Sequence, residues 1–273
     1  MRSLALIRGA VLLGLALALL PARAAEKVYT FGISPQNSAT ELAETWSPVL
    51  AWLSARSGIR LRFATATSSA DFSARLGKGA FDFCYVNPQQ YTLLNKKPGY
   101  TAFAREKDRS LKGILVVGRQ SKIDSLQQLD GATLVFSSPT SFAASVLPQA
   151  ELRKQGIRFT PQYVNSHESV YLNVAKGLYP AGGGIVRTFE LADPETRDAL
   201  RVLFSTKSYP PHAIASHPRV PASARDKLRA AMLAMNEDPV GKELLAVIKF
   251  KGFEAGIDSD WDGIRALDLP PGE

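Results

Sequence analysis

Apolar and polar residues alternate along the chain in two periods, one typical of strands and one typical of helices. Residues 28–33 (VYTFGI) predict a strand, whereas residues 41–57 place apolar side chains at helical spacing and end at Gly58, a common helix stop. The same patterns predict further strands at 59–65, 81–86, 111–117, 132–136 and 158–164, and further helices at 70–76, 141–155, 168–176, 222–235 and 240–250. Strands that alternate with helices are typical of an α/β protein whose mostly parallel sheets are flanked by helices.

The first 24 residues do not follow this alternation and predict a cleavable signal peptide. Arg2 and Arg8 precede an apolar run at 9–20, and residues 22–24 (ARA) form an A-x-A cleavage signal. The apolar run is shorter than the roughly 20 residues of a membrane-spanning helix. No cysteine lies near the cleavage point, so we expect a protein exported to the periplasm without a lipid anchor.

Charge and cysteine content restrict the possible partners. The chain carries 33 Lys and Arg against 25 Asp and Glu, and loss of the leader, with its three arginines and no acids, lowers the net charge from +8 to +5. No block of Lys or Arg marks a nucleic-acid surface, so we expect no nucleic-acid partner. Cys84 is the only cysteine, which excludes an intramolecular disulfide, and the hydrophobic core has to hold the fold.

Loops that follow predicted strands are the places to look for a ligand site, because open α/β sheets bind ligands beyond the carboxyl ends of their strands. The segment 137–148 (SSPTSFAASVLP) passes from a strand through four hydroxyl-bearing residues into a helix. Ser141 or Thr140 can cap that helix. Alternatively, the free N–H groups of its first turn can hold an oxyanion. The two interpretations are compatible, and both stay open.

Two further loops carry groups that suit an anion. In residues 164–171 (VNSHESVY), His167 lies where a helix begins, and it either donates to an oxyanion or lies at the surface beside a Ser166 cap. In residues 181–187 (AGGGIVR), three glycines leave the backbone open to a ligand or to another strand. Arg187 offers a bidentate fork for an oxyanion, or else pairs with Glu190.

Catalytic and metal-binding patterns are missing from the sequence. It contains neither G-x-S-x-G nor H-E-x-x-H, and its three histidines, at 167, 212 and 217, come without carboxylates at metal-ligand spacing. Cys84 lies in an apolar strand, where a free thiol is usually a small buried hydrophobic group. We therefore predict no enzyme activity, no cofactor and no metal.

Four segments, in this order, resemble motifs of the periplasmic solute-binding proteins of phosphonate, phosphite and phosphate ABC transporters, the PhnD-like family. They are FGISPQNS with the helix after it, GKGAFDFCYVNPQQY, SSPTSFAASVLP and VNSHESVYLNVAKGLYPAG. The likeness covers nearly all of the chain after the leader. It implies a two-lobed type II periplasmic-binding-protein fold in which each lobe is a mostly parallel sheet flanked by helices. Two hinge strands, near 115–117 and 205–209, would let the lobes close on a ligand like a Venus flytrap.

The resemblance also implies how the lobes and the ligand site are composed. Lobe 1 would hold residues 25–115 and 210–273, and lobe 2 residues 116–209. Ser141 and the N–H groups of Phe142 and Ala143 would form an anion cradle, although the family has two further hydroxyls where this chain has Phe142 and Ala143. The site would be completed by charge-assisted donors on His167, Arg187 and His212, and by Ser38, Tyr85 and Asn87 on the opposing lobe.

Arg187 and His212 stand where amine-binding relatives have a Glu and an Asp. An ammonium group would be repelled there, so we expect a small oxyanion without an amino group. The partner would be an ABC permease, and the protein a monomer. The alternative is a sensing module for a membrane histidine kinase, in which Cys84 would bind a soft ligand such as a trivalent arsenic oxyacid. An enzyme is the third and disfavoured hypothesis.

Overall fold

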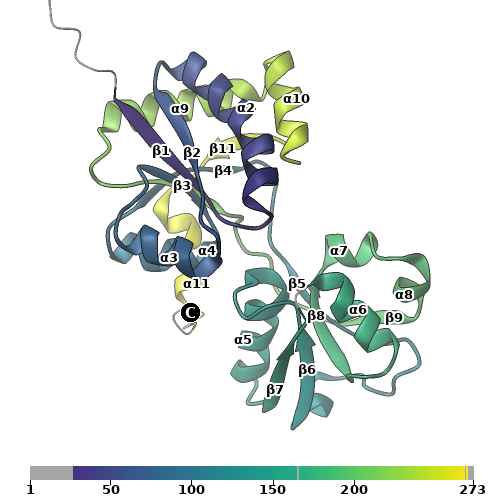
Figure 1. The fold of residues 1–273 in the computed structure, drawn as a ribbon. Coiled ribbons are helices and arrows are strands. Elements are labelled where there is room, and N and C mark those ends of the chain that lie inside the picture. The colour runs from purple at the N-terminus through teal and green to yellow at the C-terminus, as the bar shows by residue number, and fades with distance from the viewer. Residues whose placement is uncertain (1–26, 165, 268, 270–273) are drawn as a thin grey trace, which may run out of the picture.

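The chain folds into two lobes, each built on its own sheet, as the computed structural model shows (Figure 1). The structure describes residues 27–164, 166–267 and 269, so the predicted signal peptide at 1–24 lies outside the described residues. Within the described part, no helix is long and apolar enough to cross a membrane.

Lobe 1 is built on a six-stranded sheet with the order β11-β4-β10-β3-β1-β2. Its strands are β1 (Val28–Ile33), β2 (Arg60–Ala64), β3 (Phe83–Val86), β4 (Thr101–Glu106), β10 (Ala213–Ser216) and β11 (Phe253–Ala255). Its helices are α2 (Ala39–Ser57), α3 (Ser69–Gly77), α4 (Pro88–Lys96), α9 (Ala222–Met235), α10 (Pro239–Val247), the 3₁₀ helix η3 (Asp258–Trp261) and α11 (Asp262–Arg265).

Alternate residues of β3 show how the two faces of this sheet are covered. Phe83 and Tyr85 pack in the cluster formed with α2, α9 and α10. Cys84 and Val86 point the other way, into the cluster formed with α3, α4 and α11. Both faces are therefore apolar, which explains why β3 reads as a continuous hydrophobic run.

Lobe 2 is built on a five-stranded sheet with the order β7-β6-β8-β5-β9. Its strands are β5 (Gly113–Gly118), β6 (Ala132–Phe136), β7 (Phe159–Tyr163), β8 (Ala181–Ile185) and β9 (Leu200–Ser205). Its helices are the 3₁₀ helix η1 (Leu126–Leu129), the π-helix η2 (Phe142–Val146), α5 (Leu147–Lys154), α6 (His167–Ala175), α7 (Val186–Glu190) and α8 (Pro194–Asp198). Leu152 of α5 packs on one face of the sheet, and Val170 and Val174 of α6 pack on the other.

The chain passes between the lobes twice, through residues 107–112 and 206–212. Leu111 and Tyr209 form an antiparallel bridge between the two passages, with N–H to O distances of 2.8 and 2.9 Å in the two directions. β5 pairs with β8 and β9, within the sheet of lobe 2. The lobe boundaries at 115/116 and 209/210 stay predictions, and we propose that the bridge marks the hinge.

The predicted α/β class and two-lobed fold are confirmed. The strand predicted at 132–136 and the helix predicted at 222–235 have the bounds of β6 and α9. The helix predicted at 41–57 begins two residues earlier, where the Ser38 side chain accepts from the Glu41 N–H, and it ends at Gly58 with a φ of 69°. Both sheets are mixed, because β10, β11 and β5 run antiparallel to their neighbours.

Candidate functional site

The loop after β6 enters lobe 2's helical layer through a π-turn. The Val146 N–H bonds the Ser141 carbonyl at 3.1 Å, and the Leu147 N–H bonds the Phe142 carbonyl, so η2 begins with i→i+5 bonds and runs directly into α5. The N–H groups of Phe142, Ala143 and Ala144 have no acceptor among the described residues. Three peptide donors are therefore available at the start of this helix.

The hydroxyl groups of this loop are also without partners. Ser141 occupies the N-cap position, but its side chain makes no capping bond. Within the part of the chain that the structure describes, the hydroxyls of Ser137, Ser138 and Thr140 are likewise not hydrogen-bonded. Ser137 is only 4 % exposed, so its unpaired hydroxyl is costly unless something binds it. Neither Ser141 nor Thr140 therefore makes a side-chain capping bond, and the oxyanion interpretation stays a prediction.

The glycines of β5 and β8 hold this loop against the sheet. A Cβ added to Gly113 would lie 2.2 Å from the Ala143 carbonyl oxygen, and one added to Gly183 would lie 2.1 Å from that of Ala144. Gly184 gives the same close approach to the Tyr171 hydroxyl, at 2.2 Å. The bare faces of residues 182–184 therefore accommodate the helical layer of their own lobe, while β5 and β6 pair with the two edges of this strand, so neighbouring protein rather than a ligand makes the close approach.

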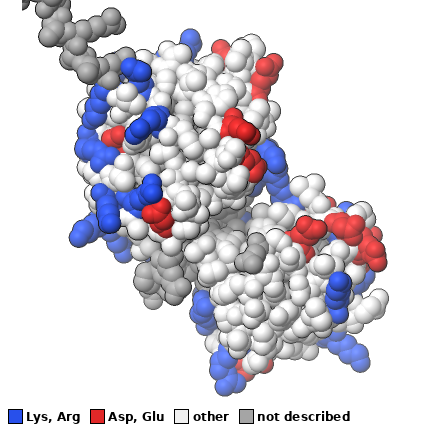
Figure 2. Space-filling model, viewed as in Figure 1, with Lys and Arg blue, Asp and Glu red and all other residues white. Residues whose placement is uncertain are grey.

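This loop faces lobe 1. Phe142 and Ala143 belong to the hydrophobic cluster that contains Phe72 and Tyr91 of lobe 1, and the Phe142 ring lies 6.4 Å from that of Tyr209 in the second passage. In the space-filling view a narrower waist joins the two lobes (Figure 2).

His167 begins α6 and is held by a short polar chain. Its Nδ1 lies 3.0 Å from the Thr188 hydroxyl, which in turn lies 2.8 Å from the Tyr171 hydroxyl. Ser166 caps the helix by accepting from the Ser169 N–H. Burial lowers the pKa of His167. The neutral imidazole is therefore favoured at pH 7, and the charge-assisted bond that the sequence predicts for His167 stays a prediction.

Arg187 lies on α7 at the side of lobe 2 that faces lobe 1. Its side chain is exposed, and no ion pair joins it to Glu190 within the described residues. Its guanidinium acts electrostatically on Glu106 at the end of β4. Arg187 thus contributes positive charge to the space between the lobes and is not held by its neighbour on the helix.

The wall of lobe 1 carries a stacked pair at the end of β3. The rings of Tyr85 and His212 lie 4.9 Å apart with an interplanar angle of 20°, and the His212 Nε2 is 2.6 Å from the Gln36 Nε2. Burial, together with the nearby Arg109 guanidinium, lowers the pKa of His212 to about 4. This histidine is also neutral at pH 7, and its predicted charge-assisted bond to an oxyanion stays a prediction.

Ser38 and Asn87 are engaged as helix caps. The Ser38 hydroxyl accepts from the Glu41 N–H at 3.2 Å, and the Asn87 Oδ1 accepts from the Gln90 N–H at 2.9 Å. Their donor groups remain available, because capping uses only an oxygen lone pair. Both residues therefore remain candidates for ligand contact from lobe 1.

A charged cluster where β4 leads into the first passage completes the site. Glu106 is 7 % exposed and lies 3.9 Å from the Arg109 guanidinium. Burial raises the pKa of Glu106, although Arg109, Arg187 and Lys251 all act to lower it. Three cations thus surround one buried carboxylate, and lobe 2 supplies one of them.

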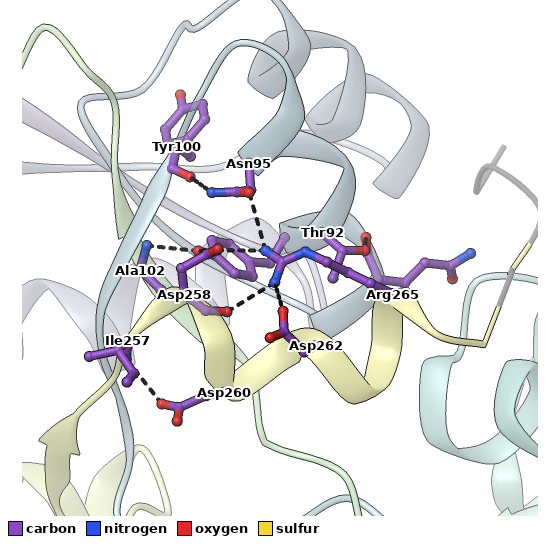
Figure 3. A network of polar contacts seen from close by, with 11 residues as sticks. Thr92, Asn95, Tyr100, Ala102, Ile257, Asp258, Asp260, Asp262 and Arg265 are labelled. Atoms are coloured by element: carbon purple, nitrogen blue, oxygen red, sulfur yellow. Dashed lines mark hydrogen bonds and ion pairs between the residues drawn. The ribbon is translucent and has the colours of Figure 1, made fainter.

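The wall formed by α4 is held in place from behind by the C-terminal segment. The Arg265 guanidinium donates to Asn95 at 3.1 Å, to Asp258 at 2.5 Å and to Asp262 at 2.5 Å, which ties α11 and η3 to α4 (Figure 3). The hydroxyl of Tyr91, also on α4, donates to Asp258. This network fixes the helix that Asn87 caps.

The sequence matches a known protein family over most of its length. Residues 31–261 match the model of a family described as ABC transporter, phosphonate, periplasmic substrate-binding protein. The chain belongs to this family.

Solved structures share the fold of this phosphonate-binding family member. A binding protein component of an ABC phosphonate transporter from Pseudomonas aeruginosa is 20% identical, with a TM-score of 0.70 over 89% of this chain and 86% of that one. PhnD1 from Prochlorococcus marinus, in complex with methylphosphonate, is 17% identical, with a TM-score of 0.72 over 89% and 97%. A Xanthomonas citri protein bound to a chloride ion is 21% identical, with a TM-score of 0.77 over 88% and 95%.

Family membership makes the protein a periplasmic substrate-binding component of an ABC transporter and not an enzyme. The setting of Cys84 agrees with this, since the side chain is 0 % exposed within an apolar cluster, and burial raises the pKa of its thiol. A buried neutral thiol does not fit the thiolate chemistry of an arsenic site. Among the described residues, no group of three or more His, Cys, Asp or Glu can hold a metal ion.

Three residues of the site in this phosphonate-binding family member were not predicted from the sequence. Gln36 contacts His212, and Glu106 and Arg109 act electrostatically on the stacked pair of Tyr85 and His212. The only signal for the two charged residues is the run REKDR at 105–109, directly after a segment that the pattern analysis did not identify as a strand.

Proposed function

We propose that the protein captures a small oxyanion, without an amino group, between its lobes and presents it to the permease of its transporter. The observation that carries this proposal is the cradle loop: three free N–H groups at a helix start and four unbonded hydroxyls in one turn, facing the other lobe. Peptide donors at a helix N-terminus suit phosphate, phosphonate and related oxyanions.

The positive charge for such a ligand comes from arginine. His167 and His212 are neutral at pH 7, so Arg187 from lobe 2 and Arg109 from the first passage are the permanent cations near the cradle and the stacked pair. A guanidinium can bind an oxyanion through two parallel N–H donors. Closure of the lobes would bring Arg187 and the cradle onto the same anion.

The same cluster argues against a ligand with an ammonium group. Glu106 is a carboxylate that acts electrostatically on Tyr85, and Arg109, Arg187 and Lys251 already act on it. An incoming ammonium would find this carboxylate compensated and two guanidinium groups close by, which disfavours it.

A thermal-shift panel tests the proposal. Phosphate, phosphite, methylphosphonate and 2-aminoethylphosphonate are compared; a ligand present at 100 times its Kd stabilises the folded state by about 2.7 kcal/mol. We expect at least one of the first three to raise Tm, and 2-aminoethylphosphonate to have a clearly smaller effect. Stabilisation by 2-aminoethylphosphonate alone would contradict the proposed ligand class.

Arg187→Glu tests whether the anion binds between the lobes. We expect it to weaken the ligand found in the panel by at least tenfold, because a charge-assisted contact is replaced by repulsion. Arg197→Glu, on α8, is the matched control, since Arg197 pairs with Asp198 and belongs to no part of the site. Equal affinities for wild type and Arg187→Glu would mean that the anion binds elsewhere.

A further inference from the structure

The helical layer of lobe 2 contributes apolar side chains to the core of lobe 1. The cluster formed with α3, α4 and α11 of lobe 1 also contains four buried side chains of η2 and the start of α5, namely Phe142, Ala143, Val146 and Leu147. Among the described residues, the two clusters on the faces of the lobe 2 sheet contain no side chain from the lobe 1 sheet or its helices. The apolar contact between the lobes is therefore made by this one segment of lobe 2.

Phe142 is the largest of these four side chains, and it also contacts the proposed hinge. Its exposed fraction is only 4 %. Its ring lies 6.4 Å from the ring of Tyr209 at an interplanar angle of 81°, which is an edge-on contact. Tyr209 forms the bridge with Leu111 that joins the two passages. The ring of Phe142 thus packs against the part of the chain about which the lobes would turn.

A second observation places the same loop beside lobe 1. Thr140, two residues before Phe142, lines a cavity together with Leu76 of α3 and Leu94 of α4. Both leucines belong to the cluster that contains Phe142. The loop therefore lies next to α3 and α4, the helices of lobe 1 that face α5 of lobe 2 across the waist (Figure 1).

Separation of the lobes would expose this apolar contact to water. In the closed arrangement the contact between Phe142 and lobe 1 is formed, and in the open arrangement it is broken. Exposure of apolar surface is unfavourable, so the contact stabilises the closed arrangement without any ligand. The Phe142 N–H is at the same time one of the free donors of the cradle. One residue therefore joins the lobes through its ring and offers its backbone to an anion.

We propose that Phe142 is a positioning residue that sets the equilibrium between the open and closed arrangements, so that part of the ligand-free protein is already closed. The consequence for binding rests on the proposed function, because the apparent affinity for an oxyanion scales with the fraction of protein in the closed, binding-competent arrangement. Loss of the ring should accordingly weaken different oxyanions by the same factor.

Distances between spin labels on the two lobes test the proposal in the ligand-free protein. The labels are attached through Lys96→Cys at the end of α4 and Lys154→Cys at the end of α5, two exposed positions on opposite lobes. The native thiol of Cys84 is 0 % exposed and stays unlabelled. Double electron–electron resonance should show the distance of the closed arrangement before any ligand is added. Phe142→Ala should lower the closed-to-open ratio by about tenfold, because full burial of a side chain of this size shifts an equilibrium by roughly ten- to hundredfold.

Phe159→Ala is the matched control for Phe142→Ala. Phe159 is a partly buried phenylalanine of lobe 2 whose cluster contains no residue of the lobe 1 sheet or its helices, so its loss should leave the wild-type distances unchanged. Phe142→Leu keeps most of the apolar side chain and should change the ratio less than Phe142→Ala does. An equal shift in Phe159→Ala would show a general loosening and contradict the proposal.

Two further outcomes would overturn the inference. The first is a wild-type protein that shows only the open distance before ligand is added, and this result needs no variant to fold. The second is a folded Phe142→Ala protein, checked by circular dichroism, with the distance distribution of wild type. Because no ligand is present, neither outcome bears on the proposed ligand class. Conversely, failure of every anion in the thermal-shift panel would overturn the proposed function and leave the role of Phe142 in closure intact.

Discussion

The wall of the cleft formed by lobe 2 consists of groups without partners, whereas the wall formed by lobe 1 consists of groups that are already engaged. On lobe 2, the first-turn N–H groups and the loop hydroxyls of residues 137–144 make no hydrogen bonds within the described chain beyond the one from Ser141 to the Ser138 carbonyl. On lobe 1, Ser38 and Asn87 cap helices, and Tyr85 and His212 stack on each other. An anion should therefore find most of its donors on lobe 2.

From this difference we expect lobe 2 to supply most of the binding affinity and lobe 1 to supply most of the selectivity. Unpaired buried donors bind a ligand with little competition from the protein itself. A wall whose groups are already engaged keeps its shape, and it can select by fit and by charge. We expect changes on lobe 2 to alter affinity for any oxyanion and changes on lobe 1 to alter the choice among them.

Gly183→Ala should have the largest effect, because it disturbs the support of the cradle. The added Cβ would lie 2.1 Å from the Ala144 carbonyl oxygen, so the backbone of η2 has to move. We expect a loss of about 2–3 kcal/mol in the free energy of unfolding, measured in urea, together with loss of anion binding. Gly118→Ala is the control, since its Cβ meets nothing within 4 Å. A stable Gly183→Ala protein with unchanged affinity would show that the loop position does not matter.

Arg265→Ala tests the opposite wall. The substitution removes the guanidinium that joins Asn95 on α4 to Asp258 and Asp262 (Figure 3). We expect about 1.5–3 kcal/mol of destabilisation, because several charge-assisted bonds are lost at a side chain that is only 23% exposed. Affinity for the smallest oxyanion should change little if lobe 2 supplies most donors.

The matched control for Arg265→Ala is Arg158→Ala. Arg158 also forms a close ion pair, at 2.8 Å to Asp130, but its side chain is 83% exposed, so we expect a much smaller loss of stability than for Arg265→Ala. Equal destabilisation by the two substitutions would mean that the α4–α11 network does not differ from a surface pair.

The structure also shows which parts of the molecule could be predicted from the sequence. The β6 strand and the α9 helix follow directly from local periodicity, and the N-terminal motifs of α2 and α6 contain the serines that cap them. The packing of residues 182–184 could not be predicted, because a glycine run looks the same whether a ligand or a helix approaches it. Only the structure shows carbonyl oxygens of η2 in that space.

The charge states of the site residues also could not be predicted from the sequence. The sequence gives no reason to expect a histidine in a loop to depart from its ordinary pKa. The pKa values of His167 and His212 are lowered by burial, and that burial depends on which helices and passages pack around the two side chains. Glu106 and Arg109 act electrostatically on Tyr85 or His212 only because β3, β4 and β10 lie side by side in the sheet of lobe 1 and the two passages begin there. No spacing in the sequence encodes that arrangement.

Glu106→Gln tests how the buried carboxylate of lobe 1 affects anion affinity. It removes a negative charge beside Arg109 and Arg187 while keeping the size of the side chain. We expect anion affinity to rise by about fivefold, corresponding to about 1 kcal/mol of relieved repulsion. The gain should be largest at low ionic strength, since salt screens such interactions. A fall in affinity would show that Glu106 instead holds Arg109 in position for the ligand.

His212→Gln should have the smallest effect, visible only in the pH dependence of stability. In the folded protein the pKa of His212 is about 4, below the unfolded value of about 6.5. The unfolded chain therefore binds the proton first, so the contribution of this residue is fully present above pH 6.5 and is lost as the pH falls toward 4. Wild type should accordingly lose more Tm than His212→Gln between pH 7 and 4.5. Differential scanning fluorimetry without ligand measures the two Tm profiles. Parallel pH profiles for the two proteins would mean that burial and Arg109 do not lower the pKa of His212 in the folded protein.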